Sequence, residues 1–259
     1  MSSTPRSLRH EYELYVENEL EAYKDSIPRN ALLKIGDEAV TSLYDQAQLA
    51  LTELVVWEEV DRIIKKRLRI PSYPTWRRKR IKLIREYQRP EHWGLHPDCV
   101  LAREVRPPAE SNVLVAGDAG ERAALYLAAH GCEVFAIDQT RDVVERVVNA
   151  AEAAGLTGRV HGYIADLRQW SPDVRLNAVV CSPSAFEGLS KRERGKVIQL
   201  LQDVTHDGGI HFVDAEGVTG AAGAESLLQE LSAQYKGWKI SMEQSNGVST
   251  SFLAKKGAA

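Results

Sequence analysis

A glycine-containing turn and an aspartate about 20 residues later are the residues of this sequence best suited to hold a ligand. The turn, Gly117-Asp118-Ala119-Gly120, follows the apolar residues 113–116, and its small side chains let backbone N–H groups approach a bound group. Asp138 closes the next apolar run, where a carboxylate can accept hydrogen bonds from both hydroxyls of a ribose. The pattern predicts a site for an adenosine-containing cofactor.

Strands and helices that alternate after residue 108 would position this turn. We expect strands at residues 112–116, 132–137, 158–164, 176–181, 207–214, 238–243 and 249–255. We expect helices between them at residues 120–130, 141–155, 190–205 and 222–235. Asn246-Gly247, between the last two strands, is typical of a hairpin. The sequence therefore predicts an α/β fold for residues 106–259: a doubly wound, mostly parallel seven-stranded sheet with an antiparallel last strand.

Residues 1–105 are predicted to form an all-helical N-terminal domain, which would serve as a lid over the acceptor or as an oligomerisation surface. We expect helices at residues 10–24, 41–69 and 76–88. Apolar residues recur at helical spacing along the long second helix and should face inward: Leu43, Ala47, Ala50, Leu54, Trp57, Ile64 and Leu68. A helix of that length can also pair with a second subunit, so a homo-oligomer stays open.

Residues 117–138, GDAGERAALYLAAHGCEVFAID, resemble the G-x-G-x-G-R-x-A-L-Y-L-A…G…V…D pattern of class I S-adenosylmethionine (SAM)-dependent methyltransferases. The resemblance covers residues 112–255 and is closest to the small-molecule members of the family. It continues through Ala165-Asp166-Leu167 after the third strand and Gly208-Gly209 before the fifth. It implies SAM as the cofactor and the transfer of a methyl group to a small-molecule acceptor.

The resemblance also implies roles for individual residues. Gly117, Asp118, Ala119, Gly120 and Glu121 would hold the methionine moiety, Asp138 the ribose with Gln139 beside it, and Asp166 and Leu167 the adenine. Cys181, Ser182, Pro183 and Ser184, at the end of the fourth strand, would line the junction with the acceptor. No residue is assigned as catalytic, and Glu187 and Asp214 are candidates for a general base by position alone.

Three residues depart from the family pattern. Val115 stands where the family usually has an acid, and Ala119 and Glu121 replace two motif glycines. The Glu121 carboxylate could repel the cofactor's carboxylate, or it could point away from it. A catalytically inactive SAM-binding or assembly module is therefore one alternative. A nicotinamide oxidoreductase ranks lower, because the turn lacks two of the three glycines of G-x-G-x-x-G.

Residues 62–89 are strongly basic in a chain whose net charge is −3. They contain 12 Lys/Arg and one acid, a net +11, whereas the other residues carry 21 basic and 35 acidic groups, a net −14. A charge run is usually a solvated or intersubunit helix face. The alternative is an RNA methyltransferase that contacts phosphate through this segment and stacks bases on Tyr73, Trp76 and Tyr87.

Cysteine spacing and the distribution of apolar residues bear on metal binding and on membrane association. The three cysteines, Cys99, Cys132 and Cys181, have no metal-binding spacing, so we expect no metal. No run of apolar residues is long enough to span a membrane, and the first residues do not resemble a signal peptide. We therefore expect a cytoplasmic protein without a membrane partner.

Overall fold

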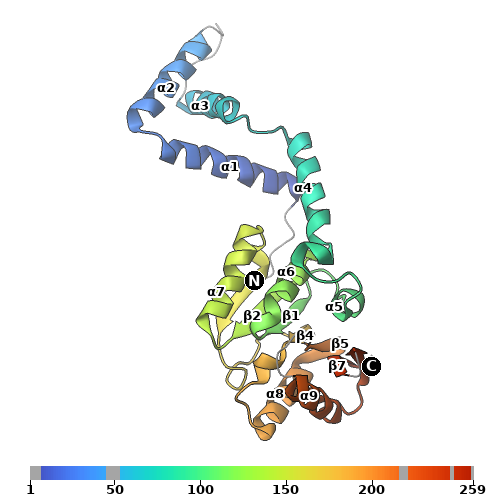
Figure 1. Cartoon of the computed structure of the whole chain (residues 1–259). Coiled ribbons are helices and arrows are strands. Elements are labelled where there is room, and N and C mark those ends of the chain that lie inside the picture. The colour runs from blue at the N-terminus through green and yellow to red at the C-terminus, as the bar shows by residue number, and fades with distance from the viewer. Residues whose placement is uncertain (1–6, 45–52, 216–220, 246–247, 258–259) are drawn as a thin grey trace. The chain divides into compact units, whose positions relative to one another are not determined.

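The computed structural model describes residues 7–44, 53–215, 221–245 and 248–257 (Figure 1). The chain divides into two compact units, Met1–Leu83 and Ile84–Ala259. Each unit has buried hydrophobic residues of its own. Among the described helices, none combines the length and the apolar character that crossing a bilayer requires.

The first unit is helical. It contains α1 (Leu8–Ser26), α2 (Arg29–Tyr44), α3 (Glu53–Leu68) and most of α4 (Tyr73–Tyr87). The Ser7 side chain accepts a hydrogen bond from the backbone N–H of His10, which caps the start of α1. The buried core of this unit is small and consists of Val16, Leu20, Ile35, Ala39, Val60, Ile63 and Ile64.

The single long helix expected over residues 41–69 is wrong. The structure has two helices here, α2 and α3, and residues 45–52 between them lie outside the described part of the chain, with Ala47 and Ala50 among them. Leu54 and Trp57, expected to face inward, are 70% and 47% exposed. Apolar spacing is a local signal, so it continues smoothly across two consecutive amphipathic helices and does not mark the break between them.

Four aromatic rings of the first unit pack together where α1 meets α4. Trp76 lies 5.4 Å from Tyr12 and 6.1 Å from Tyr15, and Tyr73 lies 5.4 Å from Tyr12, all between ring centroids. Tyr73 and Trp76 are therefore occupied by packing inside the unit. The expectation that they stack on bases is not supported by this arrangement.

The second unit is built on a seven-stranded sheet with the order β3-β2-β1-β4-β5-β7-β6. The strands are β1 (Asn112–Ala116), β2 (Glu133–Asp138), β3 (Val160–Ile164), β4 (Leu176–Cys181), β5 (Thr205–Asp214), β6 (Lys239–Ser245) and β7 (Val248–Lys255). The pairs from β3 to β5 are parallel, and β7 pairs antiparallel with both β5 and β6. This confirms the predicted doubly wound sheet with an antiparallel last strand.

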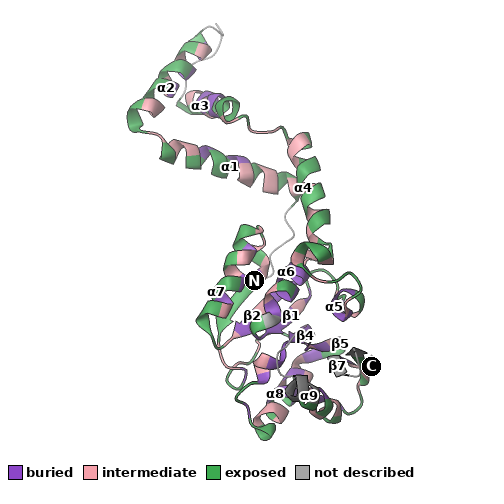
Figure 2. Ribbon diagram, viewed as in Figure 1, coloured by how far each residue is buried: buried purple, intermediate pink, exposed green. Residues whose placement is uncertain are grey.

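Helices cover both faces of the sheet, which explains why its central strands are apolar on both sides (Figure 2). The covering helices are α5 (Val100–Glu104), α6 (Glu121–Ala129), α7 (Arg141–Ala153), α8 (Lys191–Val204) and α9 (Ala221–Gln234). Val113 and Val115 of β1 belong to the core with α5, α6 and α7, whereas Leu114 and Ala116 belong to the core with α8 and α9. The alternation along β1 thus connects two separate cores.

The segment before the sheet belongs to the second unit. A short 3-10 helix, Pro90–Trp93, leads to α5, and Val100, Leu101 and Ala102 are buried in the core beneath α6. The Trp93 Nε1 donates to the Tyr87 carbonyl across 2.7 Å. The compact second unit therefore begins before residue 106, where the composition of the sequence changes.

Candidate functional site

A cavity of about 290 Å³ lies at the carboxyl ends of the central strands. It is lined by Ala116, Gly117, Asp118, Ile137, Asp138, Gln139, Thr140, Val143, Ala165, Leu167, Ser184, Ala185 and Glu187. The chain runs from β1 outward to β2 and β3, then returns to add β4 on the other side of β1. Ligands of doubly wound sheets bind at this reversal, so the cavity lies where the fold favours a site.

Gly117 makes the turn that closes β1 against β4. Its φ of +96° lies in the region that side chains disfavour. A Cβ at this position would lie 2.1 Å from Ser182 Oγ and 2.8 Å from Ser184 Oγ. Both the backbone conformation and the space available therefore require glycine here.

Asp118 is held by two serines that follow β4. The Ser184 hydroxyl donates to Asp118 Oδ1 across 2.5 Å and accepts from the Asp118 N–H across 3.0 Å. The buried Ser182 hydroxyl donates to the same carboxylate oxygen across 3.3 Å. These bonds join the turn after β1 to the loop after β4, which fixes the mouth of the cavity from both sides.

Glu121 begins α6 and is not among the described residues that line the cavity. Its carboxylate pairs with Arg146 Nε of α7 across 2.8 Å. The same guanidinium donates to the Asp118 carbonyl across 2.9 Å, so Arg146 holds both the turn and the helix start. An acid in place of the motif glycine is thus neutralised by a cation from the next helix.

Gly120 allows α6 to approach β1, because a Cβ at this position would lie 2.7 Å from Val115 Cγ1. Of the preceding residue, Ala119, only the backbone is described.

Asp138 ends β2 at the rim of the cavity, and Gln139 follows it in the lining. One carboxylate oxygen of Asp138 accepts the Thr140 N–H across 2.7 Å, which orients the side chain. Ile137, Val143 and Leu167 supply an apolar surface in the same cavity. A carboxylate beside an apolar wall suits a ribose joined to a flat base.

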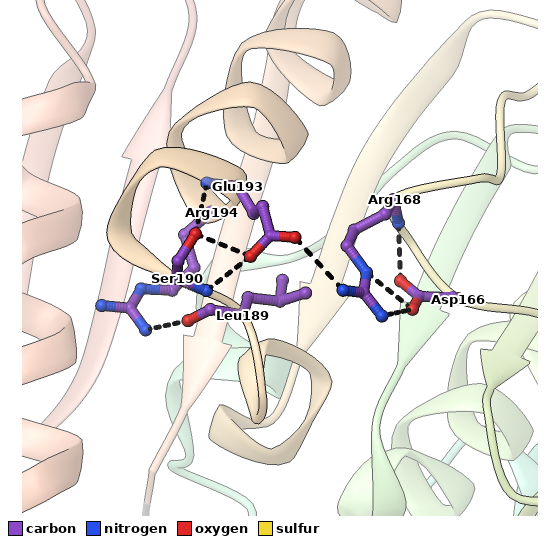
Figure 3. A network of polar contacts seen from close by, with 6 residues as sticks. All are labelled: Asp166, Arg168, Leu189, Ser190, Glu193 and Arg194. Atoms are coloured by element: carbon purple, nitrogen blue, oxygen red, sulfur yellow. Dashed lines mark hydrogen bonds and ion pairs between the residues drawn. The ribbon is translucent and has the colours of Figure 1, made fainter.

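Asp166 lies next to the cavity, but its carboxylate is engaged elsewhere (Figure 3). Oδ1 accepts the backbone N–H of Arg168 across 2.8 Å, and Oδ2 accepts from Arg168 Nε across 2.7 Å and from its Nη2. These bonds to Arg168 hold the pKa of Asp166 below its ordinary value. The segment therefore reaches the cavity through Ala165 and Leu167.

The Arg168 guanidinium also reaches α8, where it contacts Glu193 across 3.2 Å (Figure 3). Glu193 and Ser190 form a capping box, in which each side chain accepts from the other's backbone N–H. Hydrogen bonds from the Ser190 hydroxyl and backbone, followed by the Arg168 cation, lower the pKa of Glu193 to about 2. The loop after β3 is thereby attached to the start of α8.

The end of β4 contributes less to the lining than the family resemblance implies. Cys181 is 2% exposed, and burial raises the pKa of its thiol to about 12. Cys181 and Ser182 do not appear among the described residues that line the cavity, although Ser184 and Glu187 do. Asp214, at the end of β5, is also not among the described residues that line the cavity.

The cavity is acidic. Asp118, Asp138 and Glu187 line it, and none of the described lining residues is Lys, Arg or His. Such a surface attracts cationic groups and opposes phosphate.

No protein-family model matches this sequence, and no curated protein matches it. Several solved structures do. TehB from Haemophilus influenzae is 20% identical with a TM-score of 0.47, and the match covers 62% of each chain. The N-methyltransferase NodS from Bradyrhizobium japonicum WM9 is 16% identical with a TM-score of 0.45, covering 72% of this chain and 98% of NodS. A SAM-dependent O-methyltransferase from Thermotoga maritima is 14% identical with a TM-score of 0.45, covering 59% and 61%.

The strand order, with parallel strands followed by an antiparallel last strand, agrees with the layout that the resemblance to class I SAM-dependent methyltransferases implies. At these identities and TM-scores, none of the matches supports a conclusion about the site or the function. Sequence reasoning named Gly117, Asp118, Asp138, Gln139 and Leu167, and the structure brings all five to the cavity.

Other residues of the site were missed. Thr140 and Val143 could not be predicted from the sequence, because they belong to a loop and a helix that carry no recognisable motif. The role of Arg146 had no local signal either, since its partners lie 25 and 28 residues earlier in the chain.

Proposed function

We propose that the second unit binds SAM in the cavity at the ends of β1, β2 and β4 and transfers its methyl group to a small-molecule acceptor. The observation that carries the proposal is the position of Asp138. Asp138 is the last residue of β2, beside the point where the strand order reverses. It lines the same cavity as the turn at Gly117.

The residues of the cavity suit the parts of this cofactor. Asp138 would accept hydrogen bonds from the ribose hydroxyls, and Ile137, Val143 and Leu167 would contact the adenine. The turn at Gly117 would receive the methionine moiety. Because Glu121 is paired with Arg146, its charge does not oppose the cofactor's carboxylate. The departure at Glu121 therefore gives no support to an inactive module.

The bound cofactor would supply a methyl group already activated by a sulfonium, so the protein mainly has to position the acceptor. Glu187 lines the cavity on the β4 side and is exposed. Its carboxylate would orient the acceptor and accept the proton that the acceptor loses. The three carboxylates of the lining support a neutral or cationic small molecule over a phosphate-bearing acceptor.

Calorimetric titration with SAM and with S-adenosylhomocysteine tests the cofactor. Asp138→Ala should weaken binding by about tenfold or more, since it removes two charge-assisted hydrogen bonds. Asp142→Ala is the matched control, because Asp142 is an exposed acid in the first turn of α7 that does not line the cavity. Absence of binding of both compounds to the wild-type protein would refute the cofactor assignment.

The acceptor class is tested with SAM that carries a labelled methyl group. The protein is incubated with a cell extract, which is then separated by a membrane that retains macromolecules. We expect enzyme-dependent label in a compound of the filtrate other than SAM, separated from it by chromatography, and the loss of that labelled compound in Glu187→Gln. Label confined to the retained RNA or protein would overturn the small-molecule acceptor while leaving methyl transfer intact.

A further inference from the structure

Helix α4 carries several exposed Lys and Arg side chains that form no ion pair and no side-chain hydrogen bond within the described part of the chain. Five of its fifteen residues are exposed Lys or Arg: Arg77, Arg78, Lys79, Lys82 and Arg85. None of the five has an ion pair or a side-chain hydrogen bond among the described residues, whereas Arg80 on the same helix pairs with Glu11 across 3.0 Å. The cations are therefore available to an external partner.

These charges work against the helix that carries them. Arg78 and Lys82 are four residues apart, and Lys82 and Arg85 three, so neighbouring turns place like charges side by side. No residue of α4 is fully buried, as Figure 2 shows, so burial beyond the packing of Tyr73 and Trp76 does little to offset the repulsion. A helix of this kind gains most from a negatively charged partner that lies along it.

The spacing of the cations suits a linear polyanion. At 100° and about 1.5 Å per residue, Arg78, Lys82 and Arg85 fall on one face within about 60°, and they span about 10 Å along the axis. The rest of the chain outside residues 62–89 has a net charge of −14, so the excess of positive charge lies in this segment and does not reflect a generally basic protein. Steering of a polyanion would therefore lead it to this segment.

The chemistry of α4 favours nucleic acid over a lipid surface. A helix that lies in a membrane interface needs exposed apolar side chains opposite its cations. Trp76 and Tyr73 are packed against Tyr12. Leu83, which is 38% exposed, is the only exposed large apolar residue of α4. With the aromatic rings occupied, binding would rest on phosphate contacts and be independent of base sequence.

We infer that the exposed cations of α4 bind the phosphate backbone of a nucleic acid. This surface is distinct from the acidic cavity and goes beyond the proposed methyl transfer. Its existence depends neither on SAM binding nor on the identity of the acceptor.

The test uses the full chain and a fluorescein-labelled, unstructured single strand of about 20 nucleotides, as RNA and as DNA, in anisotropy titrations over a range of salt concentrations. The variant Arg78→Ala/Lys82→Ala/Arg85→Ala should bind at least tenfold more weakly than wild type. It should also reduce the slope of log affinity against log salt by about 2, since each lost phosphate contact on a single strand contributes about 0.7.

The matched control is Lys191→Ala/Arg192→Ala/Lys196→Ala, which removes three exposed cations from α8. It changes the net charge equally and should leave affinity within about twofold, with the slope unchanged. The α4 variant should keep its helix content and show an equal or higher melting temperature, because like-charge repulsion is relieved. A structural role for these cations predicts the opposite change in melting temperature.

Three results would overturn the proposal: wild-type affinity too weak to measure at low salt, equal losses in the α4 and α8 variants, or tighter binding to phosphatidylserine vesicles than to either nucleic acid. Calorimetry with SAM on the α4 variant keeps the two proposals separate. Loss of nucleic-acid binding with SAM binding intact supports this surface, and failure of SAM binding in the wild type leaves it unaffected.

Discussion

The Tyr235 hydroxyl donates a hydrogen bond to Nδ1 of His211 across 2.7 Å, and both residues are buried where the end of α9 meets β5. On the other side of the ring, His211 Nε2 lies 2.7 Å from Thr205 Oγ1, whose proton is donated to the Leu201 carbonyl. Nε2 therefore carries the ring proton, and the histidine is neutral. Burial, followed by the charge of Lys256, lowers the pKa of His211 to about 3.

The buried imidazole makes stability depend on pH. Between about pH 6.5 and pH 3 the unfolded chain holds a proton on His211 that the folded protein excludes, so its contribution is complete above pH 6.5 and declines as pH falls. We expect a loss of up to about 1.4 kcal/mol per pH unit in this window. Urea unfolding of wild type and His211→Gln from pH 7 to pH 4 measures it. Parallel curves for the two proteins would contradict this account.

Gly117→Ala should disrupt the cavity. The substituted Cβ meets Ser182 Oγ at 2.1 Å and the backbone stays at φ +96°, so strain and collision act together. We expect a fall in melting temperature and at least a tenfold loss of SAM affinity. Gly155→Ala is the control, because Gly155 also has a positive φ, +67°, but nothing lies within 4 Å of the added atom. Equal effects of the two variants would mean that backbone strain alone matters at Gly117.

Arg146→Ala should weaken SAM binding without contact between Arg146 and the ligand. Its removal frees the Glu121 carboxylate beside the cavity and releases the Asp118 carbonyl. We expect an affinity loss of about three- to tenfold, most of it recovered in Arg146→Ala/Glu121→Gln. Arg141→Ala, on the same helix but paired with Glu145 of α7, should stay near wild type. A double variant no better than the single one would exclude charge as the cause.

Arg168→Ala should return the pKa of Asp166 toward its ordinary value, because the guanidinium is the main group that lowers it. Carboxyl carbon shifts followed by NMR through an acid titration measure the change. Arg192→Ala, which removes an exposed arginine next to Glu193 in the sequence, should not alter the Asp166 titration. An unchanged Asp166 pKa in Arg168→Ala would show that the bonds to Arg168 seen here do not persist in solution.

The sheet was predictable because its information is local. Buried parallel strands such as 112–116 and 176–181 are short apolar runs, and their bounds agree with β1 and β4. Asn246-Gly247 predicted the hairpin by the same kind of short-range signal, although those two residues lie outside the described part of the chain. The position of Asp138 at the cavity could be predicted, because a residue at the end of a strand beside a glycine turn has few other places to lie.

The remainder depended on contacts that spacing does not encode. The pairing of Glu121 with Arg146, and of both Asp166 and Glu193 with Arg168, decides where those carboxylates point. The exposure of Leu54 and Trp57 could not be told from the apolar spacing on which they lie. In each case a residue's chemistry was evident, but its partner had to come from the fold.

The position of β7 has a consequence for synthesis of the protein. β7 lies between β5 and β6, although both of its neighbours precede it in the chain. Until residues 248–255 have left the ribosome, β5 and β6 have nothing between them to pair with, and the growing chain carries two open strand edges. Such edges invite association between nascent chains. Translation that pauses before this strand would therefore expose the protein to aggregation at the moment when nearly all of its sheet has been made.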